Sequence, residues 1–180
     1  SGVIPEEICT TFDNVSQFYL YNNQICPPYP DCIHPMEGGG QDISQCDTQV
    51  SLDIRNVDLD AGTLDIYITN LQNVAGFMFD IENITINGAS GGLAEDFEFQ
   101  ISINGDIGRV LGFSFVLDYI PPSEALLTQI SFSEYADNNI CFKDNSIQIS
   151  DPVGYQLPGS GTCSVLGCMD DSACNYDAQA

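Results

Sequence analysis

Apolar and polar residues alternate through the middle of the chain with the period of a β-strand. In TLDIYITN, residues 63–70, Leu64, Ile66 and Ile68 alternate with polar residues and a tyrosine. Because successive side chains of a strand point to opposite faces, this pattern predicts a strand with one buried face. The stretch 63–88 holds two more such runs, over 74–81 and 83–87. Three strands that each have an apolar face need a second sheet to cover them.

Further alternating runs supply that second sheet. They predict strands over residues 50–54, 97–103, 109–118 and 126–132, and one or two more within 140–149. Turn signals, among them Asn104-Gly105, separate the runs. Helix signals are nearly absent: we expect a loop over 88–96 and at most one helical turn over 123–127. The pattern therefore predicts an all-β fold, an antiparallel β-sandwich.

Composition divides the chain into four parts. Residues 1–47 hold half of the cysteines and a Pro-rich loop, and we interpret them as an arm pinned by disulfides. Residues 48–150 are expected to form the sandwich. Residues 151–162 are rich in Pro and Gly, and we interpret them as a linker. Residues 163–180 are expected to form a Cys/Asp-rich loop. The chain starts with Ser1 rather than Met, so we expect a processed form or a fragment.

Eight cysteines in a chain of 180 residues indicate an oxidising, extracellular compartment. All eight are expected to form disulfides: Cys9, Cys26, Cys32, Cys46, Cys141, Cys163, Cys168 and Cys174. For the first four, which allow three connectivities, we favour Cys26 with Cys32 and Cys9 with Cys46. Zinc is the rival interpretation, but the chain has a single histidine and no paired CxxC motifs.

The charge of the chain is strongly unbalanced, with 26 acidic residues against three basic ones and a formal net charge of −23. Electrostatic repulsion excludes a nucleic-acid or anionic-membrane partner. No apolar run reaches the ~18 residues that a membrane span requires. Two interpretations of the acidity stay open and are compatible: solubility in saline surroundings, and calcium loading.

Calcium is the cofactor that the acidic residues favour, because this hard cation takes six to eight oxygen ligands. Four oxygen-bearing side chains fall within eight residues near the C-terminus: Asp170, Asp171, Asn175 and Asp177. Asp58 and Asp60 flank a turn that ends in Gly62 and are a second candidate. The alternatives are a solvated acidic tail for the first group and an ordinary hairpin turn for the second.

Three strand motifs resemble those of cohesin-like domains, β-sandwich modules of bacterial surface and cellulosomal proteins. They are AGFMFDI at 75–81, VLGFSF at 110–115 and LLTQISF at 126–132, so the resemblance covers roughly residues 50–150. It implies a sandwich of the cohesin-like or jelly-roll type. Cohesins usually follow the first motif with a Tyr-Asp-Pro turn, whereas this chain continues Glu82-Asn83-Ile84-Thr85. We therefore transfer no partner-binding residue.

The C-terminal sequence GCMDDSACNYDAQA, residues 167–180, resembles the GCTDxxACNYxxxA repeats of secreted surface and viral proteins from aquatic microbes. It is also similar to the calcium-binding repeats of thrombospondin. This resemblance implies calcium binding and a location outside the cell, at a cell or virion surface. Only one copy is present.

Catalysis has little support in the sequence. His34 is the only histidine and lies beside Pro35, which favours a surface residue over a member of a catalytic triad. No Gly-rich phosphate loop precedes a helix. Tyr19, Tyr21 and Tyr29 offer faces for stacking on a sugar, although they also suit packing of the arm.

These observations predict a non-enzymatic, extracellular structural or adhesive module. It would be a subunit or decoration of a surface fibre, sheath or virion that assembles with other protein subunits, copies of itself included, with disulfides and calcium stiffening the contacts. The alternative is a carbohydrate-binding module of a larger secreted protein, with a glycan as the ligand.

Overall fold

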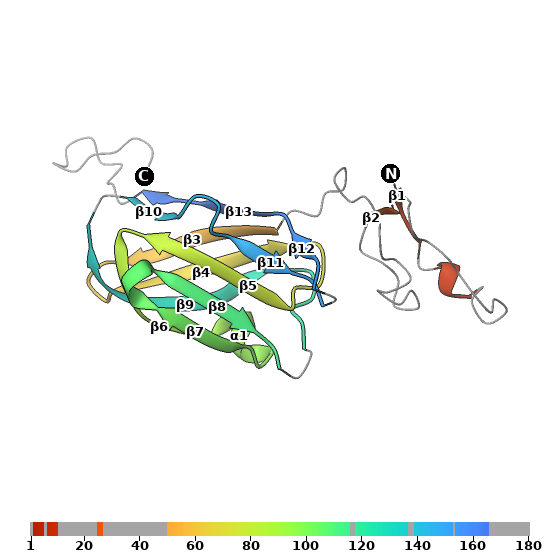
Figure 1. The fold of residues 1–180 in the computed structure, drawn as a ribbon, viewed down its shortest axis with the longest axis horizontal. Helices are drawn as coiled ribbons and strands as arrows, with labels where there is room; N and C mark the ends of the chain where they lie inside the picture. Colours follow the sequence, from red (N-terminus) through yellow and green to blue (C-terminus); the bar gives the residue numbers. More distant parts are fainter. Residues whose placement is uncertain are drawn as a thin grey trace. The chain divides into compact units, whose positions relative to one another are not determined.

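The computed structural model describes residues 2–5, 7–10, 25–26, 50–115, 118–136, 139–152 and 154–165. The chain divides into two units, residues 1–49 and residues 50–180. In the first unit, strand β1 (Gly2–Val3) pairs in parallel with β2 (Ile25–Cys26). The second unit contains two facing sheets and the short helix α1 (Figure 1).

A seven-stranded sheet is built around β5. Its strands are β5 (Gly76–Glu82), β7 (Gln100–Asn104), β8 (Arg109–Phe113), β10 (Asn139–Phe142), β11 (Gln148–Ser150), β12 (Gln156–Leu157) and β14 (Ser164–Val165). β8 lies on one side of β5, and β7 lies beyond β8. β10 and β11 share the other side of β5, with β14 next to β10 and β12 next to β11. All these pairs are antiparallel.

The other sheet has five strands in the order β13-β3-β4-β9-β6. They are β13 (Gly159–Thr162), β3 (Val50–Asp58), β4 (Thr63–Asn70), β9 (Ser123–Tyr135) and β6 (Ile84–Ser90). Its pairs are antiparallel except β13 with β3, which is parallel. Together the two sheets confirm the predicted all-β, mainly antiparallel sandwich.

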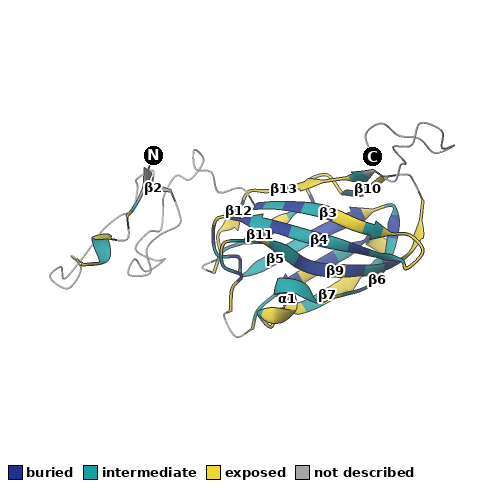
Figure 2. Ribbon diagram, turned by 180° about the vertical axis from the view of Figure 1, so that it is seen from behind, coloured by how far each residue is buried: buried dark blue, intermediate teal, exposed yellow. Residues whose placement is uncertain are grey.

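The core lies between the sheets and follows the alternation in the sequence. Leu64, Ile66 and Ile68 of β4 are fully buried, as are Phe77 and Phe79 of β5 to within 1% of their surface. Figure 2 shows the resulting change between buried and less buried residues along the strands. Burial of each such side chain stabilises the fold by about 1.5–3 kcal/mol, so this layer is the main source of stability.

Two segments differ from the sequence prediction. Residues 92–96, expected in a loop, form helix α1 (Gly92–Asp96), which buries Ala94 and packs on β9. Residues 123–127, expected to form at most one helical turn, belong to the long strand β9. In both places tertiary packing overrides a weak local preference.

Successive strands of the C-terminal segment belong alternately to the two sheets. β12 joins the seven-stranded sheet and β13 joins the five-stranded sheet (Figure 1). β14 then pairs with β10 and so returns to the seven-stranded sheet. Residues 156–162, which the composition placed in a linker, are therefore part of the sandwich. A disulfide joins Cys141 of β10 to Cys163, directly before β14, and so fixes this segment.

Removing this disulfide should destabilise the sandwich. The bond closes a chain segment with a sequence separation of 22 residues. The double variant Cys141→Ala/Cys163→Ala should lower the free energy of unfolding by about 3 kcal/mol, because the unfolded chain regains conformational freedom. Urea denaturation measures this change, with Ser164→Ala as the matched control. Equal midpoints for the double variant and the wild type would contradict it.

Gly161 of β13 should be intolerant of a larger side chain. A Cβ atom there would clash with Cδ2 of Phe142 and lie 2.7 Å from Cδ1 of Ile147, so these side chains would have to move. We expect Gly161→Val to cost about 1–3 kcal/mol in urea denaturation. Ser160→Val is the control, because the side chain of the preceding residue points to the opposite face. An equal loss of unfolding free energy in both variants would show that Gly161 does not pack against the core as described.

Candidate functional site

The outer surface of the seven-stranded sheet is unusual for so acidic a chain. The register aligns outward-facing residues of β7, β8, β5 and β11 in rows across the sheet. We call this set the neutral face: Gly76, Met78, Asp80, Gln100, Ser102, Asn104, Arg109, Leu111, Phe113, Gln148 and Ser150. Its only charged members are Asp80 and Arg109, which carry opposite charges. The next outward residue of β5, Glu82, is exposed, lies opposite Cys141 of β10 and borders the neutral face.

Apolar side chains occupy the middle of the neutral face. Leu111 of β8 lies opposite Met78 of β5 and is 36% exposed, and Phe113 follows two positions further along β8. The ring of Phe115, which is 75% exposed, packs edge-on against Phe113 with 4.7 Å between centroids. Uncharged polar residues surround this centre, among them Ser102 and Gln148, the neighbours of Leu111 and Met78 in their row. An apolar centre with a polar rim is the usual composition of a protein interface.

Asp80 and Arg109 form a bidentate ion pair at one end of the neutral face. Nε of Arg109 donates to one Asp80 oxygen at 2.6 Å, and a terminal guanidinium nitrogen donates to the other at 2.8 Å. The hydrogen bond from Arg109 holds the pKa of the Asp80 carboxyl below its ordinary value, outweighing the opposite effect of burial. Lys143 also lowers this pKa, and its backbone N–H donates to the Asp80 carbonyl. Two of the three cations of the chain thus act on one carboxylate.

The outer surface of the five-stranded sheet is different, because its carboxylates are engaged by their own neighbours. Arg55 donates to Asp53 at 2.9 Å and lies over the ring of Tyr67. Both oxygens of Asp65 accept hydrogen bonds, one from the Gln129 amide and the other from the Asn56 amide. These charged and polar groups satisfy one another, and the same surface also carries the exposed Glu124, opposite Thr69, and Leu126, opposite Tyr67.

The turn between β3 and β4 holds the candidate calcium ligands Asp58 and Asp60. One oxygen of Asp58 accepts the backbone N–H groups of Asp60 and Ala61, and Gly62 closes the turn with a φ of 64°. A carboxylate that caps its own turn has an ordinary structural role. Within the described parts of the chain, no three His, Cys, Asp or Glu side chains gather in a group suited to a metal ion. Calcium takes six to eight oxygen ligands, which include backbone carbonyls and waters as well as carboxylates. The assignment of Asp58 and Asp60 to calcium therefore stays a prediction.

The structure describes only some of the other residues that the sequence singled out. Cys141 is bonded to Cys163, and Cys9 is also disulfide-bonded. Cys26 lies in β2, but its side chain is outside the described part. The other predicted residues lie outside the described ranges: Cys32, Cys46, Cys168, Cys174, Asp170, Asp171, Asn175, Asp177, Tyr19, Tyr21, Tyr29 and His34. The two favoured pairings in the arm and the C-terminal calcium loop therefore stay predictions.

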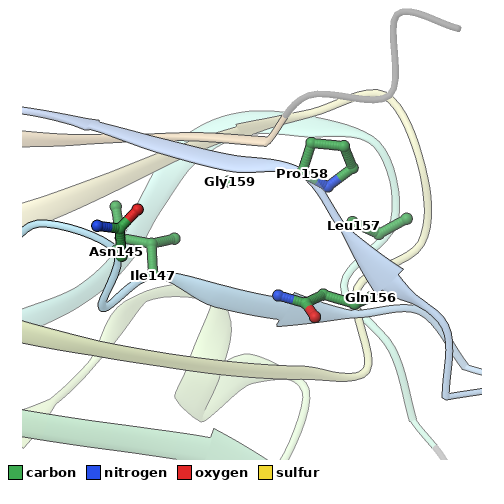
Figure 3. A pocket seen from close by; sticks show the side chains of 6 residues that line it. All are labelled: Asn145, Ile147, Gln156, Leu157, Pro158 and Gly159. Atoms are coloured by element: carbon green, nitrogen blue, oxygen red, sulfur yellow. The ribbon is translucent and has the colours of Figure 1, made fainter. Parts of the chain in front are cut away.

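A shallow groove lies where β12 crosses to β13 at the edge of the sandwich (Figure 3). It has a volume of about 440 Å³ and is lined by Asn145, Ile147, Gln156, Leu157, Pro158 and Gly159. None of these side chains titrates near neutral pH, so the groove offers no group for acid–base catalysis. Among the described residues, no helix is long and apolar enough to cross a membrane.

Sequence patterns alone did not single out the neutral face. Met78, Leu111 and Phe113 are the outward residues of strands whose apolar residues on the other face were assigned to the core. The pairing of Asp80 with Arg109 depends on the register of β5 with β8. The sequence signal that could have pointed to this pair is the rarity of cations, since the chain has only three basic residues.

Comparison with known proteins gives similarity at the level of solved structures. No family model matches the chain, and no curated protein matches it. Similar structures include a type I cohesin of Clostridium thermocellum solved in complex with a dockerin, 8% identical, with a TM-score of 0.49 over 65% of this chain and 91% of that one. A non-cellulosomal cohesin of Archaeoglobus fulgidus is 13% identical, with a TM-score of 0.46 over 64% and 87%. A type III cohesin of Ruminococcus flavefaciens is 10% identical, with a TM-score of 0.40 over 77% and 76%.

The Asp80–Arg109 pair should make stability depend on pH in the acid range. Because the pKa of Asp80 in the folded protein lies below its ordinary value of 3.8, the pair stabilises the fold above about pH 4, and this contribution is lost as pH falls further. The stability difference between wild type and Asp80→Asn should be largest near neutral pH and shrink below about pH 4. Urea denaturation across pH measures it, with Asp144→Asn, in an exposed turn, as the control. A difference that stays constant with pH would contradict the role of the pair.

Proposed function

We propose that this chain is a non-enzymatic, extracellular structural or adhesive module that assembles with other protein subunits, copies of itself included, through the neutral face. The observation that carries the proposal is the near absence of net charge on this face. Contacts between side chains, rather than a reaction, are what this surface can provide.

Electrostatic repulsion decides where two such chains can meet. Each carries a formal charge of −23, and exposed charges repel within the Debye length of about 8 Å at physiological ionic strength. On the neutral face the charge of Asp80 is compensated by Arg109, so two copies that meet there avoid the closest contacts between carboxylates. Desolvation of Met78, Leu111 and Phe113 then supplies the favourable free energy.

The five-stranded sheet is less suited to this role. Burial of its outer surface against a partner would remove water from Asp53, Asp65 and Arg55. Desolvating charged groups costs free energy unless the partner replaces their hydration. The neutral face has a lower cost: Arg109 is as exposed as Arg55, at 41%, but Asp80 is already nearly buried, with 7% of its side chain exposed against 24% for Asp53.

Disulfides and calcium complete the proposal. The Cys141–Cys163 bond is a feature of oxidising compartments and supports a location outside the cell, at a cell or virion surface. We assign calcium to Asp170, Asp171, Asn175 and Asp177, whose oxygen side chains suit it. Bound calcium would lower the net negative charge and so weaken repulsion between subunits.

Light scattering of the purified chain in calcium and in excess chelator, at constant ionic strength, tests this function. The wild type should have a larger mass in calcium than in chelator. Leu111→Asp places a charge in the centre of the neutral face and should reduce assembly in calcium at least about tenfold, which corresponds to about 1.4 kcal/mol per contact. Ser51→Asp adds the same charge to the outer surface of the other sheet and should assemble like the wild type.

Each alternative outcome has a definite meaning. A monomer under both conditions would refute self-assembly, and saturable binding on a glycan array would then favour a carbohydrate-binding module. Equal assembly of Leu111→Asp and the wild type would refute the neutral face as the contact surface. Assembly that is unchanged by chelator would refute the part assigned to calcium.

A further inference from the structure

Strand β7 forms one border of the seven-stranded sheet. Within the described residues it pairs only with β8, so alternate backbone N–H and C=O groups along its other side have no strand partner. Four of its five residues are exposed, and Figure 2 shows much of the strand in the exposed colour. Helix α1, which precedes it in the chain, packs on β9 instead. β6 of the other sheet contacts β7, and the Ile86 carbonyl lies against Gly105 directly after it, without a ladder of strand hydrogen bonds.

This border lacks the features that usually prevent pairing with another chain. Natural edge strands are protected by charged residues, prolines or bulges. The sequence of β7, Gln-Ile-Ser-Ile-Asn, has neither a charge nor a proline, and its register with β8 is regular from Gln100 to Asn104. By contrast β6, the border strand of the other sheet, is interrupted by two register shifts. β7 thus has the backbone geometry required to accept another strand.

Acidic residues flank β7 at both ends. Glu98 lies two positions before the strand and Asp106 two positions after it, and both are exposed. An added strand would bring its own ends close to these carboxylates. Charge complementarity therefore favours a segment with an uncharged centre and a basic residue near each end.

The chain has no segment of this kind. Its only basic residues are Arg55, Arg109 and Lys143, and each lies within or next to a strand of the sandwich. A second copy would bring Glu98 and Asp106 close to the same acidic residues. The charges at this border therefore favour a different protein as the partner.

We propose that β7 binds an extended segment of another protein as an additional strand, and that this segment has about five uncharged residues between basic ends. The added strand would cover Ile103 and Ile107, which are 38% and 49% exposed. Backbone hydrogen bonds supply affinity, and the carboxylates at the two ends select the partner and its position. These backbone groups are distinct from the side chains of the neutral face, so this inference does not depend on the proposed function.

Synthetic peptides test the proposal by hydrogen–deuterium exchange of the whole chain. The probe has the sequence of β7 between two lysines at each end. A second peptide has glutamates in place of the lysines, and a third has proline in place of the central serine. The lysine peptide should slow amide exchange in residues 100–104, whereas the glutamate and proline peptides should not, because one is repelled and the other lacks a central N–H group.

Charge variants provide the matched comparison. At low ionic strength Glu98→Gln/Asp106→Asn should weaken binding of the lysine peptide about fivefold, as expected for the loss of two exposed charge pairs. Glu124→Gln/Asp144→Asn removes the same charge elsewhere and should bind like the wild type. Slower exchange confined to β7, together with this difference, supports the proposal. The absence of protection in β7, equal protection by the glutamate peptide, or equal weakening in the two double variants would overturn it.

Discussion

Burial of alternating apolar residues between two sheets is the interaction on which the rest of this structure depends. A chain with a net charge of −23 cannot be held together by its ion pairs, since it has three basic residues and two of them act on Asp80. The cohesive free energy comes instead from residues such as Leu64 and Ile66 of one sheet and Phe77 and Phe79 of the other. Their packing fixes which side of each strand faces outward, and it thereby determines the composition of both outer surfaces.

The sequence allowed the fold class to be predicted because the period-two pattern is strong in the central strands. Leu64, Ile66 and Ile68 follow it without interruption, and the structure buries all three. The conformation of a segment was predicted less well where its local sequence preference differs from the conformation that tertiary packing imposes. Ser123 and the residues after it carry no clear alternation but form part of β9, where pairing with β4 decides the conformation. Gly159 and Gly161 gave residues 151–162 the composition of a linker, whereas the glycines are there because Ile147 and Phe142 leave no room for a side chain.

The candidate site was harder to predict than the fold, for a physical reason. Its members come from β5, β7, β8 and β11, and only the register across four strands brings them together. Asp80 and Arg109 are 29 residues apart in the chain and form an ion pair because β5 and β8 align them. Sequence reasoning concentrated instead on runs of neighbouring carboxylates, such as Asp58 and Asp60. There the structure shows a capped turn.

The parallel pairing of β13 with β3 has a consequence for how the module carries load. Gly159 aligns with Val50 and Thr162 with Asp53, so the chain enters β3 at one end of this pair and leaves β13 at the other. Beyond Thr162 the chain reaches Cys163, whose disulfide to Cys141 passes tension from the C-terminal side to β10. Tension that reaches β13 pulls it and β3 in opposite directions, so the hydrogen bonds between them are loaded together in shear and do not open one after another. In a surface fibre or appendage, this geometry would make the sandwich a mechanically resistant link.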